Sequence, residues 1–352
     1  MRKFVGVCAL FAVVGAAAPM TTLAFADADD ASVTGEKLEA MKAEYRRPSE
    51  IPSPSDNAYS PERATLGKAL FFDPRLSGSG AISCASCHNP ALGWSDGLTV
   101  GIGHMGSRLT RHSPTIENLA WGGPYFWDGR AESLEEQAKG PLQSPTEMNM
   151  STDAERIVTS IEGYKSAFAG AYPGEPVTID TIAKAIASFE RTVISGKAPF
   201  DRWIEGDENA ISQAAKRGFA LFSDKANCAA CHSGWRFTDD GFHDIGIKSQ
   251  DKGRGAVLEG VPVLQYAFKT PTLRNVALRA PYEHDGSQKT LRDVIDFYDG
   301  GYESRPSLSP DIKKLNLTER EKDDLIAFLY TLTGSEPVVL PVLPQSQSYA
   351  AK

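Results

Sequence analysis

Apolar residues recur at helical spacing along most of the chain, and no segment alternates polar and apolar residues long enough to predict a strand. In the segment 178–193 the apolar positions lie three and four residues apart, on one face of a helix. They are Ile179, Ile182, Ile186, Phe189 and Val193. Similar spacing predicts helices around Leu66–Phe71 and over 36–46, 153–168, 214–222, 290–298 and 318–333. The pattern therefore predicts a mainly α fold with few or no strands.

Two five-residue motifs of the form C-x-x-C-H lie in this helical pattern, at 84–88 and 228–232. This form attaches haem c, because the two thiols add to the haem vinyl groups and the histidine binds the iron. A zinc site or a redox pair is the alternative, but a zinc ribbon keeps its cysteine pairs closer and requires no histidine after each. We therefore expect two covalently bound haems c, held by Cys84, Cys87 and His88 and by Cys228, Cys231 and His232.

A helical pattern precedes each motif, so the chain reads as two copies of one cytochrome-type unit. A capping box at Thr318 and Glu321 and a glycine at 334 bound the last predicted helix. Proline-rich polar segments lie at both ends, and 196–206 reads as the junction. The expected layout is a signal peptide (1–26), a tether (27–61), an N-terminal cytochrome c-like domain (62–200), a C-terminal cytochrome c-like domain (201–335) and a tail (336–352).

The first residues read as a secretory signal. Arg2 and Lys3 precede an apolar run over 4–18, and an A-x-A site ends at Ala26. The fifth cysteine, Cys8, lies in this leader. The run is too short for a membrane anchor, and no later segment is apolar enough to span a membrane. Since haem c is attached outside the cytoplasm, we expect a periplasmic protein.

The net charge of the whole chain is −8. This argues against a nucleic-acid partner and suits a basic redox protein, although ordinary solubility explains the charge equally well.

The axial ligands of the two haem irons are harder to predict from the sequence. A pure electron carrier fills both axial positions, whereas a peroxidase keeps one open or displaceable. No methionine follows the second motif, so the candidate axial ligands of the second haem are His243, His284 and tyrosines such as Tyr298. An inward-facing tyrosine, however, is usually a core residue.

Longer motifs in the same order resemble the bacterial di-haem cytochrome c peroxidase and MauG family over 62–334. They are Ile82-Ser83 with the first haem motif, Gly103-His104, 126–130 (FWDGR), 137–141 (QAKGP), 145–149 (PTEMN), 270–276 (TPTLRNV) and 281–286 (PYEHDG). The resemblance implies two cytochrome c-like haem domains packed together.

At the second haem the resemblance implies that Tyr298 is an axial ligand. Tyr298 lies fourteen residues after His284, where the peroxidases have methionine and MauG has tyrosine. A phenolate oxygen stabilises oxidised iron and lowers its potential, whereas a thioether raises it.

At the first haem the resemblance implies roles for four more residues. His104 matches a peroxidase histidine that caps the resting iron and leaves on activation, and which MauG lacks. Glu147 matches the glutamate that moves a proton during O–O cleavage, and Gln137 matches its pocket neighbour. Trp127 matches a tryptophan that relays electrons between the haems. Without the family resemblance, His104 would read as a loop histidine, Glu147 as a surface acid and Trp127 as a core tryptophan.

Two positions depart from the family. MauG has a tryptophan two residues before its second haem motif, where this chain has Ala226, so maturation of methylamine dehydrogenase is not the expected task. The family's calcium is bound by an asparagine, where this chain has His112. Because imidazole is a poor calcium ligand, Ca²⁺ is at most a minor expectation.

The resulting hypothesis is a periplasmic di-haem peroxidase. It reduces hydrogen peroxide to water with electrons from a small cytochrome c or copper protein, and high-valent iron is shared between the two haems. The alternatives are MauG-like oxidation of tryptophan or tyrosine in a protein substrate, and a non-catalytic di-haem electron carrier. The family resemblance also allows a homodimer, whereas neither nucleic acid nor a membrane span is expected.

Overall fold

The computed structural model describes residues 35–150, 153–334 and 336–345. The predicted signal peptide and Cys8 lie outside these residues. The helices are α1 (Gly35–Glu44), α2 (Pro61–Phe72), α3 (Cys84–Cys87), α4 (Leu134–Gln143), α5 (Ala154–Ser160), α6 (Glu162–Ala171), α7 (Ile179–Glu190), α8 (Pro199–Ile204), α9 (Gln213–Ser223), α10 (Arg254–Val257), α11 (Leu291–Asp296) and α12 (Glu319–Tyr330).

The strands of the described residues are short. β1 (Phe242–His243) pairs antiparallel with β2 (Phe268–Lys269), with Phe242 opposite Lys269. The predicted mainly α fold is therefore confirmed. None of the described helices combines the length and the apolar character that crossing a bilayer would take.

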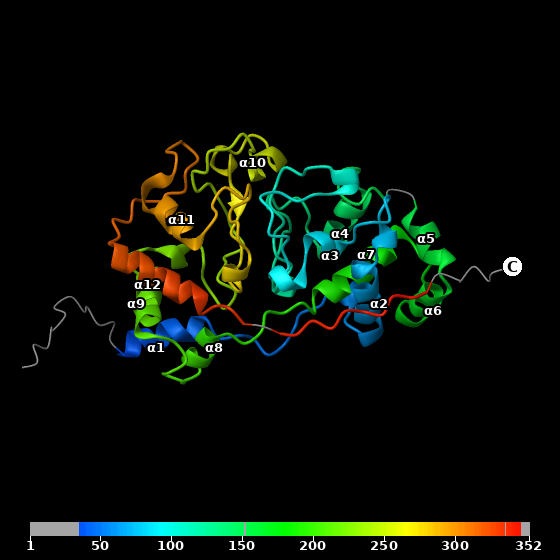
Figure 1. Ribbon diagram of the computed structural model, residues 1–352, viewed down its shortest axis with the longest axis horizontal. Helices are drawn as coiled ribbons and strands as arrows, with labels where there is room; N and C mark the ends of the chain where they lie inside the picture. The colour runs from blue at the N-terminus through cyan, green and yellow to red at the C-terminus, as the bar shows by residue number, and fades with distance from the viewer. Residues whose placement is uncertain (1–34, 151–152, 335, 346–352) are drawn as a thin grey trace, which may run out of the picture.

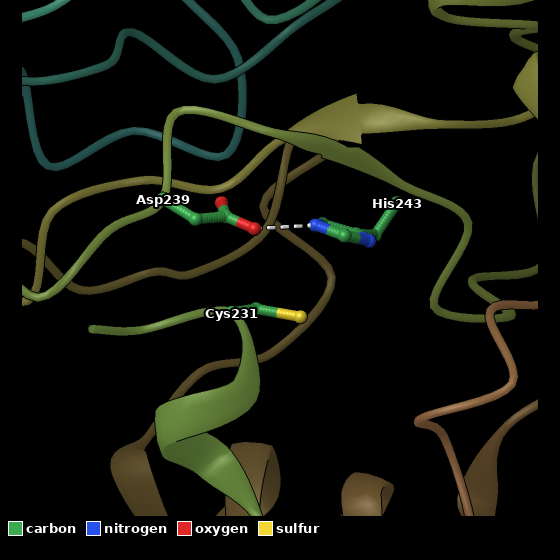
Figure 2. Close-up of side chains that lie close together, drawn as sticks. All are labelled: Cys231, Asp239 and His243. Atoms are coloured by element: carbon green, nitrogen blue, oxygen red, sulfur yellow. Dashed lines mark hydrogen bonds and ion pairs between the residues drawn. The ribbon is translucent and has the colours of Figure 1, made fainter.

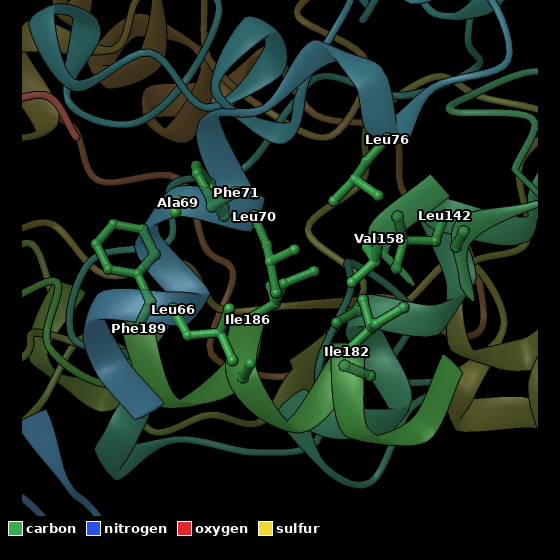
Figure 3. Close-up of a cluster of buried hydrophobic side chains, with 14 of the residues drawn as sticks. Leu66, Ala69, Leu70, Phe71, Leu76, Leu142, Val158, Ile182, Ile186 and Phe189 are labelled. Carbon is green, nitrogen blue, oxygen red and sulfur yellow. The ribbon is translucent and has the colours of Figure 1, made fainter. Parts of the chain in front are cut away.

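The elements form two lobes that face each other (Figure 1). The first lobe contains α2 to α7, and its core joins the inward faces of α2, α4, α5 and α7 (Figure 3). The helix α6 adds Tyr164 and Phe168 to this core. The second lobe contains α8 to α12, and its core is rich in phenylalanine, with Phe200, Phe219 and Phe328 fully buried. Each lobe thus has its own hydrophobic core.

A glycine lets two helices cross closely in each lobe. In the first lobe α2 crosses α7, and a Cβ on Gly67 would lie 1.8 Å from the carbonyl oxygen of Ala185. In the second lobe α9 crosses α12, and a Cβ on Gly218 would lie 2.0 Å from the carbonyl oxygen of Asp324. The two lobes therefore repeat one helix crossing that only glycine permits.

A loop after each haem motif is also repeated, over 114–131 and 271–288. Asn118 and Asn275 occupy equivalent positions in the two loops, and both have left-handed backbones, with φ of 61° and 59°. Bridges of the same kind then link Tyr125 with Ala131 and Tyr282 with Gln288. The helix before each motif was the only signal used to predict the repeat, although both loops also share the pattern P-T-x-x-N.

Two segments differ from the helix predictions, and a third agrees with them. The helix predicted over 153–168 is divided into α5 and α6 at Ile161, whose extended backbone places its side chain in the core. The predicted junction contains α8, which buries Phe200 and Trp203 in the second lobe. The helix predicted over 36–46 is confirmed as α1, and Tyr45 just after it is part of the second core.

The C-terminal segment crosses in the opposite direction. After α12 the chain runs back beneath both lobes to the first one (red in Figure 1). There Leu343 packs against the first core, and Arg75 Nη2 donates a 2.9 Å hydrogen bond to the carbonyl oxygen of Pro344. Each end of the described chain is thus attached to the lobe more distant in sequence.

Candidate functional site

A cavity of about 780 Å³ extends between the lobes and is lined by both C-x-x-C-H motifs. The four motif cysteines are half-buried and form no disulfide. His88 and His232 line the same cavity. The structure therefore brings together all six residues predicted to hold the haems.

The first motif forms a single helical turn, α3. At its start the Ser83 backbone N–H donates to Ser86 Oγ at 3.0 Å, and at its end the His88 backbone N–H donates to the carbonyl oxygen of Cys84 at 2.9 Å. His88 Nδ1 lies 3.2 Å from the carbonyl oxygen of Trp94. Because a carbonyl only accepts, Nδ1 carries the proton and Nε2 is left as the ligand atom.

The second motif has the same arrangement around a 3₁₀ turn (Cys228–Ala230). His232 Nδ1 donates to the carbonyl oxygen of Phe237 at 2.9 Å. Burial lowers the pKa of both His88 and His232 and so favours the neutral imidazole that binds metal. Both histidines are therefore oriented and neutral, as axial ligands need to be.

Glu147 and Gln137 line the part of the cavity that the first motif enters. Gln137 comes from α4, and Glu147 comes from the turn that follows it. The loop containing Gly103 packs so closely on this turn that a Cβ on Gly103 would lie 2.1 Å from the carbonyl oxygen of Thr146. Both residues thus come from the first lobe and line the cavity that contains the first motif, and the charge of Glu147 acts on Cys84 and Cys87.

His104 does not line the cavity, although its neighbour Gly103 does. Its backbone N–H donates to the carbonyl oxygen of Glu147 at 2.8 Å, and its Nε2 lies 3.2 Å from Asn149 Nδ2. Its Nδ1 is buried without a hydrogen-bond partner. His104 is thus attached to the Glu147 turn, and its role as a displaceable ligand stays a prediction.

Trp127 lies where the lobes meet. It is buried and lines the cavity, and its indole N–H donates to the carbonyl oxygen of His112 at 2.8 Å. Its ring meets His284 edge-on at 6.5 Å, and His284 in turn stacks on Phe268 at 3.6 Å. Trp127 and His284 occupy equivalent positions of the repeated loops, so the repeat itself brings them together.

Tyr298 faces the same cavity from the second lobe. It lies in a π-helical turn (Phe297–Gly301) that continues α11, a distortion often found at functional sites. Burial and the charge of Glu283 raise the pKa of the Tyr298 phenol well above its ordinary value. The protein surroundings alone therefore favour the neutral phenol, and a phenolate there needs a cation to stabilise it.

Two acids in the cavity wall, the buried Glu190 and the half-buried Glu283, were not predicted. Burial raises the pKa of Glu190 to about 8 and that of Glu283 to about 7. Glu190 ends α7, and its Oε2 has no hydrogen-bond partner. A sequence signal for Glu190 exists, because it is a charged residue beside Phe189 on the apolar stripe of this helix.

Cys231, Asp239 and His243 lie close enough to suggest a separate metal site (Figure 2). His243 Nε2 lies 2.8 Å from Asp239 Oδ2. However, Cys231 belongs to the second haem motif, where its sulfur is needed for the thioether bond. The group therefore forms part of the haem site and is not an independent metal centre.

The side chains at the expected calcium position do not fit this ion. His112 offers no oxygen, and its ring nitrogens contact the carbonyl oxygen of Leu98 at 2.7 Å and Ser95 Oγ at 3.3 Å. The positive charge of Arg279 also acts on this imidazole. A hard cation prefers oxygen ligands and negative surroundings.

The donor set fits two haems c. Each half of the cavity presents two thiols and one imidazole whose Nε2 is free, between apolar walls. The family profile described as "Di-haem cytochrome c peroxidase" matches residues 61–209, and "Cytochrome c" matches 215–333. The chain is 52% identical over 94% of its length to the methylamine utilization protein MauG of Methylorubrum extorquens, of which it covers 96%.

The chain belongs to the di-haem cytochrome c peroxidase and MauG family. The MauG protein of Methylophilus methylotrophus is 48% identical over 86% of this chain and 92% of its own. The cytochrome c551 peroxidase of Pseudomonas aeruginosa is 38% identical over 82% and 83%. Membership in this family means that the two motifs carry two covalently bound haems c, and that the chain is an oxidoreductase.

Solved structures agree with this membership. A MauG-like protein associated with microbial copper homeostasis has a TM-score of 0.75 and 35% identity, and the match covers 82% of this chain and 95% of that one. The diheme peroxidase BthA of Burkholderia thailandensis has a TM-score of 0.71 and 26% identity over 82% and 91%. The two-lobed di-haem fold is thus shared with both a MauG-like protein and a peroxidase of this family.

Proposed function

We propose that this member of the family is a periplasmic peroxidase that reduces hydrogen peroxide to water with electrons from a small redox protein. The observation that carries the proposal is the asymmetry of the cavity. A carboxyl group and an amide accompany the first motif, whereas a tyrosine accompanies the second. With the haems bound, this arrangement would leave the haem held by His88 accessible to peroxide, whereas Tyr298 would offer an oxygen ligand to the haem held by His232.

The haems, when bound, supply the iron that reacts with peroxide and the capacity to hold oxidising equivalents. With the haems bound, His88 and His232 would hold the two irons, and Tyr298 would offer a further oxygen ligand in the second lobe. The peroxide molecule enters beside Glu147, after any movement of the loop that carries His104. Its reduction consumes two electrons and two protons and yields two water molecules.

Glu147 moves the proton that O–O cleavage requires. One peroxide oxygen loses a proton to the carboxylate of Glu147, and the carboxyl group returns it to the departing oxygen. Gln137, which lines the same cavity, orients the peroxide by hydrogen bonding. The apolar walls limit the entry of water, which strengthens these polar contacts.

Trp127 is the proposed electron relay between the two haem sites. Its buried position at the meeting of the lobes and its fixed indole N–H support this role. A small cytochrome c or copper protein then restores both electrons from outside. Because haem c is attached outside the cytoplasm, the reaction is assigned to the periplasm.

The test is to mix the holoprotein with stoichiometric peroxide, with and without reduced cytochrome c. We expect peroxide consumption and oxidation of two cytochromes per peroxide. The Glu147→Gln variant should lose activity by about 10²-fold or more, because general acid–base catalysis contributes this much. Glu132→Gln, at an exposed position on the same lobe, is the matched control. Absence of peroxide consumption in both redox states would leave only an electron carrier.

A second candidate function is oxidation of tryptophan or tyrosine in a partner protein, as MauG does. The high identity to two MauG proteins favours it. Ala226, in place of the MauG tryptophan, argues against the same partner. Modified residues in a trapped partner would support this function, whereas rapid turnover with reduced cytochrome c would support the peroxidase.

A further inference from the structure

A second pair of aromatic rings bridges the lobes, apart from Trp127. Trp121 of the first lobe meets Trp235 of the second lobe edge-to-face, with ring centroids 4.8 Å apart and an interplanar angle of 83°. Both side chains are partly exposed. Unlike Trp127, neither lines the large cavity, so this pair lies between the cavity and the surface.

The backbone around each indole is fixed to the wall of the haem cavity. Trp235 lies in the loop between His232 and Phe237, the two residues joined by the Nδ1 hydrogen bond. Arg274 Nε donates to the carbonyl oxygen of Trp235 at 2.7 Å. The loop that orients the second axial histidine therefore also carries Trp235.

Trp121 has a similar attachment on the first lobe. It ends a 3₁₀ turn that begins at Leu119, a residue that lines the cavity. The Tyr125 hydroxyl donates to the carbonyl oxygens of Leu119 and Gly122, at 3.2 and 2.8 Å, on either side of Trp121. Each indole is thus held by hydrogen bonds of its own loop, and each lies only a few residues along the chain from a residue that lines the cavity.

The indole N–H groups of this pair differ from those of two other tryptophans. Trp127 donates to His112, and Trp203 donates to Glu208 Oε2 at 3.1 Å. Within the described ranges, no acceptor is found for the N–H of Trp121 or Trp235. An indole that loses an electron becomes a strong acid at this nitrogen, so a partly exposed N–H can release its proton to water and regain it on reduction.

A cation distinguishes the two rings. The Arg47 guanidinium lies 5.5 Å from the ring centroid of Trp235, whereas no cation–π contact to Trp121 is found in the part of the chain that the structure describes. A positive charge over a ring stabilises the intact π system and opposes removal of an electron. When the pair has lost one electron, the oxidised indole should therefore be Trp121 and not Trp235.

We propose that Trp235 and Trp121 form the entry route by which single electrons from the donor protein reach the haem cavity. The inference rests on the proposed peroxidase function. One electron passes from the indole pair towards the cavity, and the one-electron donor returns one to the pair. Two such cycles per hydrogen peroxide supply the two electrons that form two water molecules. The indoles end unchanged, and the donor is oxidised.

The experiment omits the donor, so that the electron-deficient indole persists. The holoprotein is treated with peroxide and a nitroso spin trap, which adds to carbon-centred radicals, and adducts are mapped by peptide mass spectrometry. We expect the adduct mainly on Trp121, less on Trp235, and none on Trp203, which serves as the internal control. Added reduced cytochrome c should suppress the adduct.

Variants then test the route with the donor present. Trp235→Phe and Trp121→Phe should each slow oxidation of reduced cytochrome c by at least about tenfold. Trp203→Phe, outside the route, should keep the rate. Wild-type protein that consumes no peroxide would refute the proposed function itself. Peroxide consumption with equal labelling of Trp203, or with unaltered rates in both pair variants, would refute only the route.

Discussion

Single buried side chains in this protein take their charge from their surroundings, and Asp73 is a clear case. It is fully buried where α2 ends. Arg75 Nη2 donates to it at 2.6 Å and the Tyr164 hydroxyl at 2.7 Å. Burial opposes the charged carboxylate, but these hydrogen bonds outweigh it, so the pKa of Asp73 lies below its ordinary value.

The depressed pKa of Asp73 predicts an acid-sensitive contribution to stability. The contribution is complete above the unfolded pKa of about 3.9 and is lost as the pH falls through the folded pKa. Asp73→Asn should lower the free energy of unfolding by about 3 kcal/mol at neutral pH and flatten its dependence on acid pH. Urea unfolding of the holoprotein at several pH values measures this. Asp180→Asn, in an exposed ion pair with Lys139, is the control, and equal slopes in both variants would contradict the assignment.

The proposed ligation by Tyr298 gives a second prediction for a single residue. In Tyr298→Met a neutral thioether replaces a phenolate, so the reduction potential of the second haem should rise, within the roughly 0.8 V that axial ligands span. Potentiometric titration and electron paramagnetic resonance check this. Tyr302→Met, beyond the π-helical turn, is the control. An unaltered second-haem signal in Tyr298→Met would show that Tyr298 is not a ligand.

Among the elements, helices that carry their own sequence signals were predictable. The apolar stripe of 178–193 and the capping box at Thr318 both correspond to helices, α7 and α12. α8 was missed because six residues hold too little periodicity, and burial of Phe200 and Trp203 in the second core accounts for it. The break at Ile161 likewise depends on the core it fills, which no local pattern contains.

Some residues of the candidate site were likewise predictable from the sequence, and others were not. The haem motifs were predictable because covalent attachment fixes the spacing of Cys84, Cys87 and His88. Glu190 left only one signal, a charge on the apolar stripe of its helix, and the Trp121–Trp235 pair left none, because the two rings meet only after the lobes pack. Short motifs specify local chemistry, whereas no short motif specifies burial by residues that are distant in the sequence.

The helix crossings give a prediction at the scale of elements. Gly218→Ala places a methyl group against the carbonyl oxygen of Asp324 and should separate α9 from α12, which costs about 1–3 kcal/mol or more. Chemical denaturation of the holoprotein measures the loss. Gly170→Ala in α6 is the control, because its Cβ meets no atom within 4 Å. If the two variants were equally stable, the close crossing would not depend on glycine.

In the whole molecule, the two terminal segments connect the lobes in opposite directions. Lys42 of α1 forms an ion pair with Glu208 of the second lobe at 3.0 Å, and Pro344 accepts its hydrogen bond from Arg75 of the first. Electron transfer between the haems requires a fixed separation, and crossed segments oppose both parting and sliding of the lobes. The positions of the termini are therefore part of the architecture of the site.

The tail contact predicts how the two lobes share stability. Leu343 packs against the first core, whereas its neighbour Val342 is 92% exposed. Leu343→Ala should lower the free energy of unfolding by about 1–2 kcal/mol, because it returns apolar surface to water. Val342→Ala should stay within about 0.5 kcal/mol of the wild type. Urea unfolding followed by the absorbance of both haems measures these values. An equal effect of the two substitutions would show that the tail does not support the first lobe in solution, and the crossed connection would then be incomplete.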